Sequence, residues 1–425
     1  MRILLIVNQF PPDVNSTGQL MAELATCWVE WGHQVSVVTS LPHYQDFRIE
    51  AAYRGKLYQR DPVGGLEVFR LWVYAPGKKS MLNRLISYLS FAAGATLIGW
   101  LRRDSWDVIL CANGGFFTGI AAWLIGASKA IPFIYNVQDL YPEVPVAAGQ
   151  LRNRHAIEIL RRIEAFMYRK ARRVSVISTA MRDNLLGKNL APEKVTVIPN
   201  FVDCEFIRPM ARANEFSQVN GLDDKFVVMH AGNLGYVYDF DSFLRAAKAL
   251  EQERDIVFLI VGEGVAKAAL ERRAQELRLS NVLFLPFQPR QQLPWLRATA
   301  DIQVSLYKSG AARHSMPSKI YEIMASGRPL LASAERHSAV WQLVQDTGGG
   351  ICVEPENVEQ LTEAIRRLRD DVELRNRFAV NGRRAAQALY DKDFVAKAYQ
   401  DLLQRVANAG GVAAHYGEAR YQAKA

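Results

Sequence analysis

The chain has 425 residues, of which 49% are hydrophobic and 22% are charged. This length predicts two or three domains, and the composition excludes both a low-complexity chain and a small disulfide-stapled one. The four cysteines form no CxxC pair and no Cys/His spacing typical of zinc sites, which favours a reducing cytoplasm.

The net charge of +9 is concentrated in the first half of the chain. Residues 1–190 hold 22 Lys and Arg against 14 Asp and Glu, whereas residues 191–425 hold 30 against 29. The excess is densest in 152–173, where only Glu158 and Glu164 are acidic. Such a patch attracts phosphate or an anionic membrane surface, although a plain solvated helix face would look the same. It contains few stacking aromatic residues, so we expect no nucleic-acid partner.

In chain order, the opening apolar run 3–7 is too short for a signal peptide and predicts a buried strand. The next distinctive segment is 85–101, which holds 17 uncharged residues between Arg84 and the pair Arg102 and Arg103. About 20 residues are needed to span a bilayer. Three interpretations stay open for this segment: a core helix, a helix lying partly in the membrane interface, or a membrane span.

Short β-branched runs alternate with longer segments of helical period, which is typical of parallel sheets with crossover helices. The expected strands of the first half are 3–7, 34–39, 68–73, 108–111, 133–136, 174–177 and 195–198. Those of the second half are 226–231, 256–261, 282–285, 302–305, 330–332 and 350–353. The alternation starts twice, so we predict an α/β protein of two doubly wound, Rossmann-like domains that face each other across a cleft.

We expect one domain over 1–205 and a second domain over 206–392. The polar stretch 211–225 lacks strand or long helical patterning and is expected to belong to the interdomain linker. Residues 393–425 are expected to be a helix that crosses back to the first domain, followed by a flexible tail.

The most informative stretch runs from Ser315 to Leu331. Proline near its start and glycine then proline at its end predict a short helix over about 317–326. The start of this helix would favour a phosphate, to which Lys319 adds a positive charge. Glu322 lies one turn further on the same face and could accept from two vicinal hydroxyl groups, as on a ribose. A surface helix with an ordinary Lys/Glu pair is the alternative.

Several ordered motifs accompany this helix. They are 10–13 (FPPD) with 16–18 (STG), 138–143 (QDLYPE), 197–203 (VIPNFVD), 232–235 (GNLG), 260–264 (IVGEG) and 317–329. Together they resemble the retaining glycosyltransferases of family 4, which are GT-B enzymes, and in particular the subgroup that builds bacterial cell-surface polysaccharides. The resemblance covers about residues 1–405.

The resemblance implies a hexosyltransferase-like enzyme that moves a sugar from a nucleotide-sugar donor to a hydroxyl of a lipid-linked or other glycan acceptor. It makes 1–205 the acceptor-binding domain and 206–392 the nucleotide-sugar-binding domain. It places Thr17 and Gly18 in a loop that approaches the donor, where a glycine permits close contact. The remaining implied donor-binding residues are Gly232, Asn233, Gly262, Glu263, Phe287, Ser318, Lys319 and Glu322. The acceptor-side candidates are Asn136, Asp139 and Glu143, which follow or end the strand 133–136. Ordinary turn and capping roles are the alternative for these residues.

The sequence departs from the family pattern at three places. His314 stands where the family often has a glutamate, Gln138 stands where many members have a histidine, and Asn233 with Tyr238 replaces an arginine and a lysine that hold the diphosphate. The cationic role would then fall to Lys319 and Arg313, since a leaving diphosphate needs its charge stabilised. We interpret these changes as features of the subgroup.

For the mechanism, no carboxylate stands out as a covalent nucleophile, so the resemblance implies a front-side reaction in which the leaving phosphate helps to deprotonate the acceptor. The residues expected to take part in catalysis are Lys319, Glu322, Arg313 and Asp139. Asp239-Phe-Asp241 superficially matches a metal-binding DxD motif, but it precedes a helical segment and is expected to cap it. We therefore expect no metal and no cofactor.

We expect the enzyme in the cytoplasm, either free or peripheral on the inner face of the cytoplasmic membrane. A same-fold nucleotide-sugar epimerase or hydrolase, and a catalytically silent sugar-nucleotide binder, are the alternatives.

Overall fold

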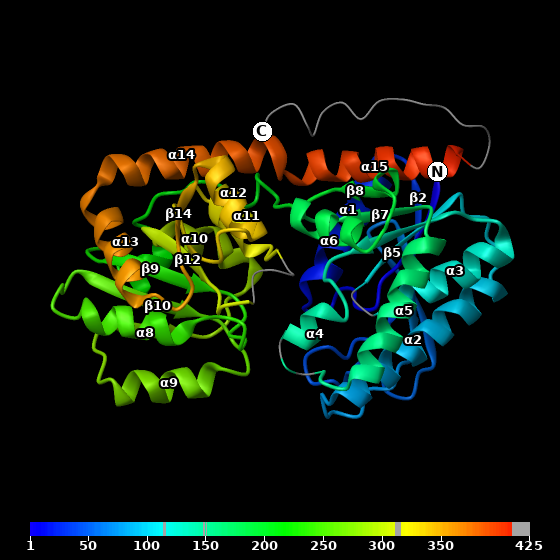
Figure 1. The fold of residues 1–425 in the computed structure, drawn as a ribbon, viewed down its shortest axis with the longest axis horizontal. Helices are drawn as coiled ribbons and strands as arrows, with labels where there is room; N and C mark the ends of the chain where they lie inside the picture. The colour runs from blue at the N-terminus through cyan, green and yellow to red at the C-terminus, as the bar shows by residue number, and fades with distance from the viewer. Residues whose placement is uncertain (114–115, 148, 150, 311–315, 410–425) are drawn as a thin grey trace. The chain divides into compact units, whose positions relative to one another are not determined.

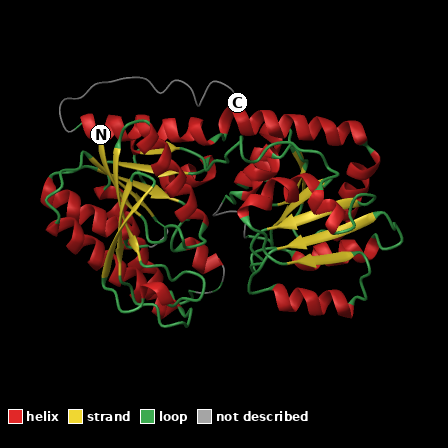
Figure 2. Cartoon of the chain, turned by 180° about the vertical axis from the view of Figure 1, so that it is seen from behind, coloured by secondary structure: helices red, strands yellow, loops and turns green. Residues whose placement is uncertain are grey.

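The computed structural model describes residues 1–113, 116–147, 149, 151–310 and 316–409. The chain divides into two compact units. Unit 1 comprises Met1–Pro199 together with the chain from Lys392 onward, and unit 2 comprises Asn200–Asp391. The predicted α/β class is confirmed: each unit has one sheet that is parallel or nearly so, with helices packed around it (Figures 1 and 2).

Unit 1 has an eight-stranded sheet of order β3-β4-β2-β1-β5-β6-β7-β8. Its strands are β1 (Arg2–Ile6), β2 (Gln34–Ser40), β3 (Tyr58–Val63), β4 (Leu66–Leu71), β5 (Val108–Ala112), β6 (Phe133–Val137), β7 (Arg173–Val176) and β8 (Val195–Val197). Its helices are α1 (Ser16–Glu30), α2 (Met81–Leu101), α3 (Thr118–Lys129), α4 (Glu143–Ala147), α5 (Arg154–Lys170), α6 (Thr179–Gly187) and α15 (Lys392–Asn408). Short 3-10 helices occupy Ala51–Tyr53 and Pro192–Lys194.

The strand β3 is absent from the sequence-based prediction. It pairs antiparallel to β4 at the edge of an otherwise parallel sheet and is mostly exposed. Its sequence, YQRDPV, is polar and contains Pro62, so it has no buried apolar run to mark it. The other strands of this sheet lie where the sequence predicts them. The central strands β1, β5 and β6 are almost entirely buried, and apolar residues dominate them.

Unit 2 has a six-stranded, fully parallel sheet of order β11-β10-β9-β12-β13-β14. Its strands are β9 (Phe226–Ala231), β10 (Ile256–Val261), β11 (Val282–Leu285), β12 (Ile302–Leu306), β13 (Leu330–Ser333) and β14 (Gly350–Val353). Its helices are α7 (Glu215–Val219), α8 (Phe240–Ala249), α9 (Lys267–Glu276), α10 (Leu293–Thr299), α11 (Lys319–Ala325), α12 (Ala339–Thr347), α13 (Val358–Asp370) and α14 (Val372–Leu389), with a 3-10 turn at Arg290–Gln292. The strand order is that of a doubly wound nucleotide-binding sheet, whose direction of winding reverses between β9 and β12.

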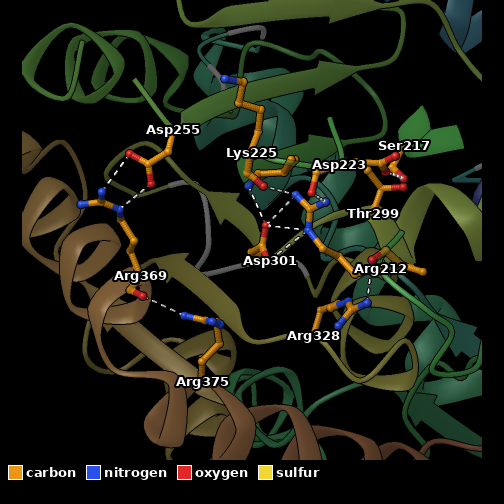
Figure 3. Close-up of polar contacts among 12 residues, drawn as sticks. Arg212, Ser217, Asp223, Lys225, Asp255, Thr299, Asp301, Arg328, Arg369 and Arg375 are labelled. Carbon is orange, nitrogen blue, oxygen red and sulfur yellow. Dashed lines mark hydrogen bonds and ion pairs between the residues drawn. The ribbon is translucent and has the colours of Figure 1, made fainter. Parts of the chain in front are cut away.

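The polar stretch 211–225 is folded as part of unit 2, contrary to its interpretation as a linker. The Arg212 guanidinium pairs with Asp301 at 3.1 Å and also donates to the carbonyl oxygens of Asp223 and Lys225 (Figure 3). Asn214 caps α7, which buries Phe216. The polarity of this stretch therefore reflects a network of specific hydrogen bonds.

The last helix, α15, belongs to unit 1. It packs on α1, and the Trp28 indole of α1 donates a hydrogen bond to the Ala396 carbonyl at 3.1 Å. Its Tyr399 hydroxyl accepts a 2.7 Å hydrogen bond from Asn136 at the end of β6. These contacts join the end of the described chain to the centre of the first sheet.

Segment 85–101 lies within α2. Among the described residues, α2 is the one helix long and apolar enough to cross a membrane, a test that the core helices of soluble proteins also pass. About a third of its most apolar window, 33%, is buried against the rest of the protein. Helices α2, α3 and α5 lie side by side (Figure 1).

Candidate active site

The candidate donor site lies in unit 2, where β9, β10 and β12 end and the winding of the sheet reverses. The turns that follow β9 and β10 touch through their backbones. Gly232 and Gly262 have φ values of 137° and 149°, and a Cβ on Gly262 would lie 1.9 Å from the Gly232 carbonyl oxygen. Only glycine at position 262 permits this approach. The Gly232 amide donates to Val261 and the Leu234 amide donates to Glu263, each at 2.9 Å, which fixes the two turns together.

The Lys319 side chain of α11 reaches the same place. Its Nζ lies 3.8 Å from the centre of the Tyr238 ring, 3.4 Å from His230 Nε2, and 4.0 Å from where a Cβ would stand on Gly232. The ammonium therefore sits beside the first glycine turn. A phosphate bound at that turn would lie within reach of the Lys319 ammonium.

The surroundings of Lys319 disfavour its charge when the site is empty. Burial and the neighbouring Arg297 guanidinium hold the pKa of Lys319 well below its usual value, against the opposing effect of Glu322. Part of the lysine still reaches solvent, which weakens this shift without reversing it. Burial, Lys319 and Arg297 also hold the pKa of His230 well below its usual range. A bound anion would relieve this crowding of cationic groups.

Glu322 is held by Arg297, a residue of α10 that the sequence-based prediction missed. Arg297 is 4% exposed; its Nη2 donates to Glu322 Oε2 at 2.5 Å and its Nη1 donates to Gln303 Oε1 at 2.7 Å. Gln303 in turn bonds Ser326 at the end of α11. The Glu322 side chain keeps 32% of its surface exposed, so this carboxylate is oriented from one side and open on the other. Nothing in the sequence around Arg297 distinguishes it from a surface arginine.

Aromatic rings surround the lysine. Tyr238 lies between His230 and Tyr307, with ring centroids 5.2 Å from each, and Phe240 lies 4.7 Å from the His230 ring. Tyr238, one of the departures from the family pattern, thus supports Lys319 through its ring face. A cation over a tyrosine ring is attracted by the quadrupole of the ring.

The other predicted donor-side residues of unit 2 surround this cluster less closely. Asn233 is exposed in the turn after β9, and Phe287 follows β11 with 56% of its surface exposed. Glu263 pairs with Lys267 at 2.6 Å, as a turn residue facing solvent would. Ser318 stands directly before α11, which is shorter than the predicted helix over 317–326. Arg313, like His314, lies outside the described residues.

In unit 1, Thr17 and Gly18 lie in the first turn of α1. The Gly18 amide donates to the capping side chain of Asn15 at 3.0 Å. A Cβ on Gly18 would lie 2.5 Å from the Gln9 carbonyl oxygen. Packing therefore explains the glycine at position 18, because α1 approaches the loop after β1 too closely for a side chain there. Asn8, which directly precedes Gln9, is fully buried, and its side-chain amide has no hydrogen-bond partner among the described residues.

Of the acceptor-side candidates, one is exposed and the side chains of the other two make hydrogen bonds or ion pairs within unit 1. Asp139 is exposed just beyond β6, and its backbone carbonyl accepts a hydrogen bond from Asn113 at 2.6 Å. Asn136 is fully buried, where its amide bonds Ser175, Gln138 and Tyr399.

Glu143, the third of these candidates, is directed towards α5 and α6. Its carboxylate pairs with Lys188 at 3.1 Å and lies 3.8 Å from Arg161. Lys188 also pairs with the buried Glu164 at 2.8 Å. Asp139 is the exposed one of the three candidates, and partial burial by its surroundings raises the pKa of its carboxyl.

The acidic pair that resembles a DxD motif has structural partners. Asp239 caps α8 by accepting from the Ser242 amide at 3.2 Å, as predicted, and Asp241 pairs with Arg273 at 3.2 Å. Within the described part of the chain, no group of three or more His, Cys, Asp and Glu residues is placed to hold a metal ion.

Comparisons with known proteins assign both halves of the chain. The family model described as a glycosyl transferase 4-like domain matches residues 17–200, and the model of glycosyl transferases group 1 matches residues 212–385. WcaI of Escherichia coli strain K12, whose name assigns it provisionally to glycosyl transfer in colanic acid biosynthesis, is 28% identical over 375 residues. These cover 86% of this chain and 91% of WcaI.

Solved structures share the fold. Sucrose-phosphate synthase from Thermosynechococcus elongatus superposes with a TM-score of 0.77 at 18% identity, over 96% of this chain and 100% of that one. Anabaena HepE in complex with UDP superposes with a TM-score of 0.73 at 16% identity, over 95% and 100%. These neighbours confirm the GT-B fold predicted from the motifs. With its two family models in order along the chain, this protein belongs to the family 4 glycosyltransferases.

Proposed function

We propose that this enzyme transfers a sugar from a nucleotide-sugar donor, with retention of configuration, to a hydroxyl of a lipid-linked or other glycan acceptor in the biosynthesis of a cell-surface polysaccharide. The observation that carries the donor assignment is the position of Lys319 beside the turn at Gly232, with Glu322 oriented by Arg297 on the same short helix. The polysaccharide role draws support from the likeness to WcaI.

In this proposal the diphosphate of the donor rests on the glycine turns and against the Lys319 ammonium. The ribose hydroxyls bond the open side of Glu322, and the base lies near Phe287 at the end of β11. The likeness to HepE, which was solved in complex with UDP, supports a nucleoside diphosphate as the ligand of this fold. The distance between Lys319 and Glu322, one helical turn, suits a phosphate and a pentose of one molecule.

The proposed reaction breaks the bond between the anomeric carbon of the sugar and the donor phosphate oxygen. The acceptor oxygen forms the new bond on the face from which the phosphate leaves, and the departing phosphate accepts the acceptor proton. Lys319 stabilises the negative charge that develops on the diphosphate, because it presents an ammonium in a partly desolvated site. Asp139, the exposed acceptor-side candidate, would orient the acceptor hydroxyl.

The proposal assigns no metal to this reaction, since Asp239 and Asp241 are already engaged with α8 and Arg273. Activity measured with and without a chelator would check this part. The enzyme would work in the cytoplasm, peripheral to the inner face of the membrane, where lipid-linked acceptors are available.

The test measures donor consumption with and without glycan acceptors for the wild type, Lys319→Ala and Glu322→Ala. We expect acceptor-dependent consumption that falls at least about a hundredfold in either variant, in the range seen when a transition-state donor is removed. Consumption that needs no acceptor would favour the same-fold hydrolase or epimerase. Unchanged rates in both variants would remove these residues from the site, and donor binding without any turnover would indicate a silent binder.

A further inference from the structure

The exposed face of α2 is apolar along its whole length. Its members are spaced three or four residues apart, as on one side of a helix. They are Leu82, Ile86, Leu89, Ala93, Leu97 and Trp100, which we call the α2 stripe, and the five large ones are 37% to 64% exposed. The solvent side of a helix in a globular protein normally carries polar residues. This stripe extends for about 27 Å at 1.5 Å per residue.

The opposite face of α2 is firmly packed in unit 1. Phe91 and Ala95 are buried, and Gly99 lies so close to α3 that a Cβ there would meet the Ile125 side chain at 2.4 Å. Crossing a bilayer would require α2 to leave this packing. A position along the surface of a membrane leaves it intact, because only the α2 stripe has to enter the apolar region.

A basic pocket of about 420 Å³ opens at the ends of α3 and α5. Its charged lining consists of Arg169, Lys170, Arg172 and Lys194, and among the described residues no acidic side chain lines it. Trp123 forms a wall, with Lys170 Nζ 5.8 Å from its ring centre. Burial together with the cationic Arg172 and Arg173 lowers the pKa of Lys194. A phosphate group in this pocket would neutralise cations that otherwise repel one another.

The end of the α2 stripe is bonded to α3, the helix whose Trp123 lines the basic pocket. The Trp100 indole donates to the Leu124 carbonyl of α3 at 3.4 Å, and Leu124 is the neighbour of Trp123 in the pocket wall. The end of α2 is also joined to α3 by Lys129, which donates to the Arg102 carbonyl. Helix α3 packs against both α2 and α5, so the helix that carries the stripe and the helices that frame the pocket are neighbours (Figure 1).

We propose that the α2 stripe and the basic pocket form a single docking surface for an anionic lipid bilayer, in which the stripe enters the headgroup and acyl boundary and the pocket holds a lipid phosphate. This inference deepens the membrane location given under the proposed function and rests on it. A bilayer fits better than a second copy of the chain, because a symmetric contact through the stripe would bring two basic pockets towards each other.

The test measures binding of the full chain to vesicles by flotation. One set is phosphatidylcholine alone, and the other contains a minority of phosphatidylglycerol. We expect binding to the anionic vesicles, weakened by salt, and release by alkaline carbonate, as for a peripheral protein. Lys170→Glu with Arg172→Glu, and separately Leu89→Glu with Leu97→Glu, should each weaken binding at least about tenfold.

The matched controls lie on unit 2. Val380→Glu replaces an equally exposed apolar residue of α14, and Arg254→Glu replaces an exposed arginine; both should bind vesicles like the wild type. The stabilisation of every variant by a nucleotide-sugar donor should be unchanged, which separates failure of this surface from failure of the donor site. Wild-type protein that stays unbound, pocket and stripe variants that bind as the wild type does, or a dimer that forms through α2 in place of vesicle binding would overturn the proposal.

Discussion

Arg297 Nη2 and Glu322 Oε2 lie 2.5 Å apart, between a guanidinium that is almost fully buried and a carboxylate that is partly open. The two residues are on different helices and 25 positions apart. Arg297 thus orients the carboxylate of Glu322, the proposed ribose-binding group, from its buried side. We therefore expect a change of Arg297 to alter how well the protein recognises the pentose of the donor.

Replacing Arg297 by lysine should weaken donor binding by about tenfold, or 1.4 kcal/mol, because one ammonium cannot bond both Glu322 and Gln303 in a fork. Calorimetry with a nucleoside diphosphate and with its 2′,3′-dideoxy analogue would check this. The variant should lose its preference for the hydroxylated ligand. Glu322→Gln serves as the matched control, and an Arg297→Lys variant that discriminates between the two ligands as the wild type does would contradict the positioning role.

Donor affinity should fall as the pH rises through the lowered pKa of Lys319. The empty site holds this pKa well below the usual value, whereas a bound diphosphate favours the ammonium and raises it. Between these two pKa values binding takes up a proton, so affinity is greatest at the low end of the window and decreases towards its high end. Calorimetry of an intact nucleotide sugar in buffers of different ionisation enthalpy measures the uptake. Lys319→Arg, which stays protonated, should show none.

Tyr238 should contribute to donor binding through its ring, which supports the Lys319 ammonium, and not through its hydroxyl. Tyr238→Phe is expected to leave donor affinity nearly unchanged, whereas Tyr238→Leu should lose about 0.5 to 2 kcal/mol of support for the Lys319 ammonium. Titration of each variant with the donor gives the comparison. Equal losses in both variants would mean that the hydroxyl, and not the ring face, matters.

Gly262→Ala should destabilise unit 2 and abolish donor binding. The new Cβ would meet the Gly232 carbonyl at 1.9 Å, and the backbone at 262 has a φ of 149° that other residues rarely adopt. We expect a loss of roughly 2 to 4 kcal/mol in the free energy of unfolding, measured by denaturant titration. Gly187→Ala, at the end of α6 with open space around it, should be neutral. A fully stable Gly262→Ala protein would show that the two turns can separate.

The sequence was informative wherever burial is continuous. Most strands of both sheets carry apolar residues that are buried, so thirteen predicted strands agreed on one parallel α/β pattern. The edge strand β3 was not predicted because it is polar and mostly exposed. The capping role of Asp239 was predicted from the helical segment that follows it and was confirmed. These are local relationships, which a sequence displays directly.

Relationships between distant residues could not be predicted in this way. Arg212 and Asp301 are 89 positions apart, yet their ion pair fixes a stretch whose polarity suggested a linker. The Arg297 contact with Glu322 and the ring of Tyr238 beneath Lys319 depend on which strands are neighbours in the sheet. The close approach of Gly18 to the Gln9 carbonyl was likewise not predicted from the sequence. Such pairings require the tertiary fold.

The most direct measurement is the equilibrium binding of UDP-, GDP- and TDP-sugars to the wild type, Lys319→Ala, Glu322→Ala and the control Glu373→Ala, an exposed residue of α14. The account predicts that at least one donor binds the wild type, that both variants at the helix lose at least about tenfold in affinity, and that the control does not. A donor that binds all four proteins equally would place the nucleotide elsewhere and contradict the central claim.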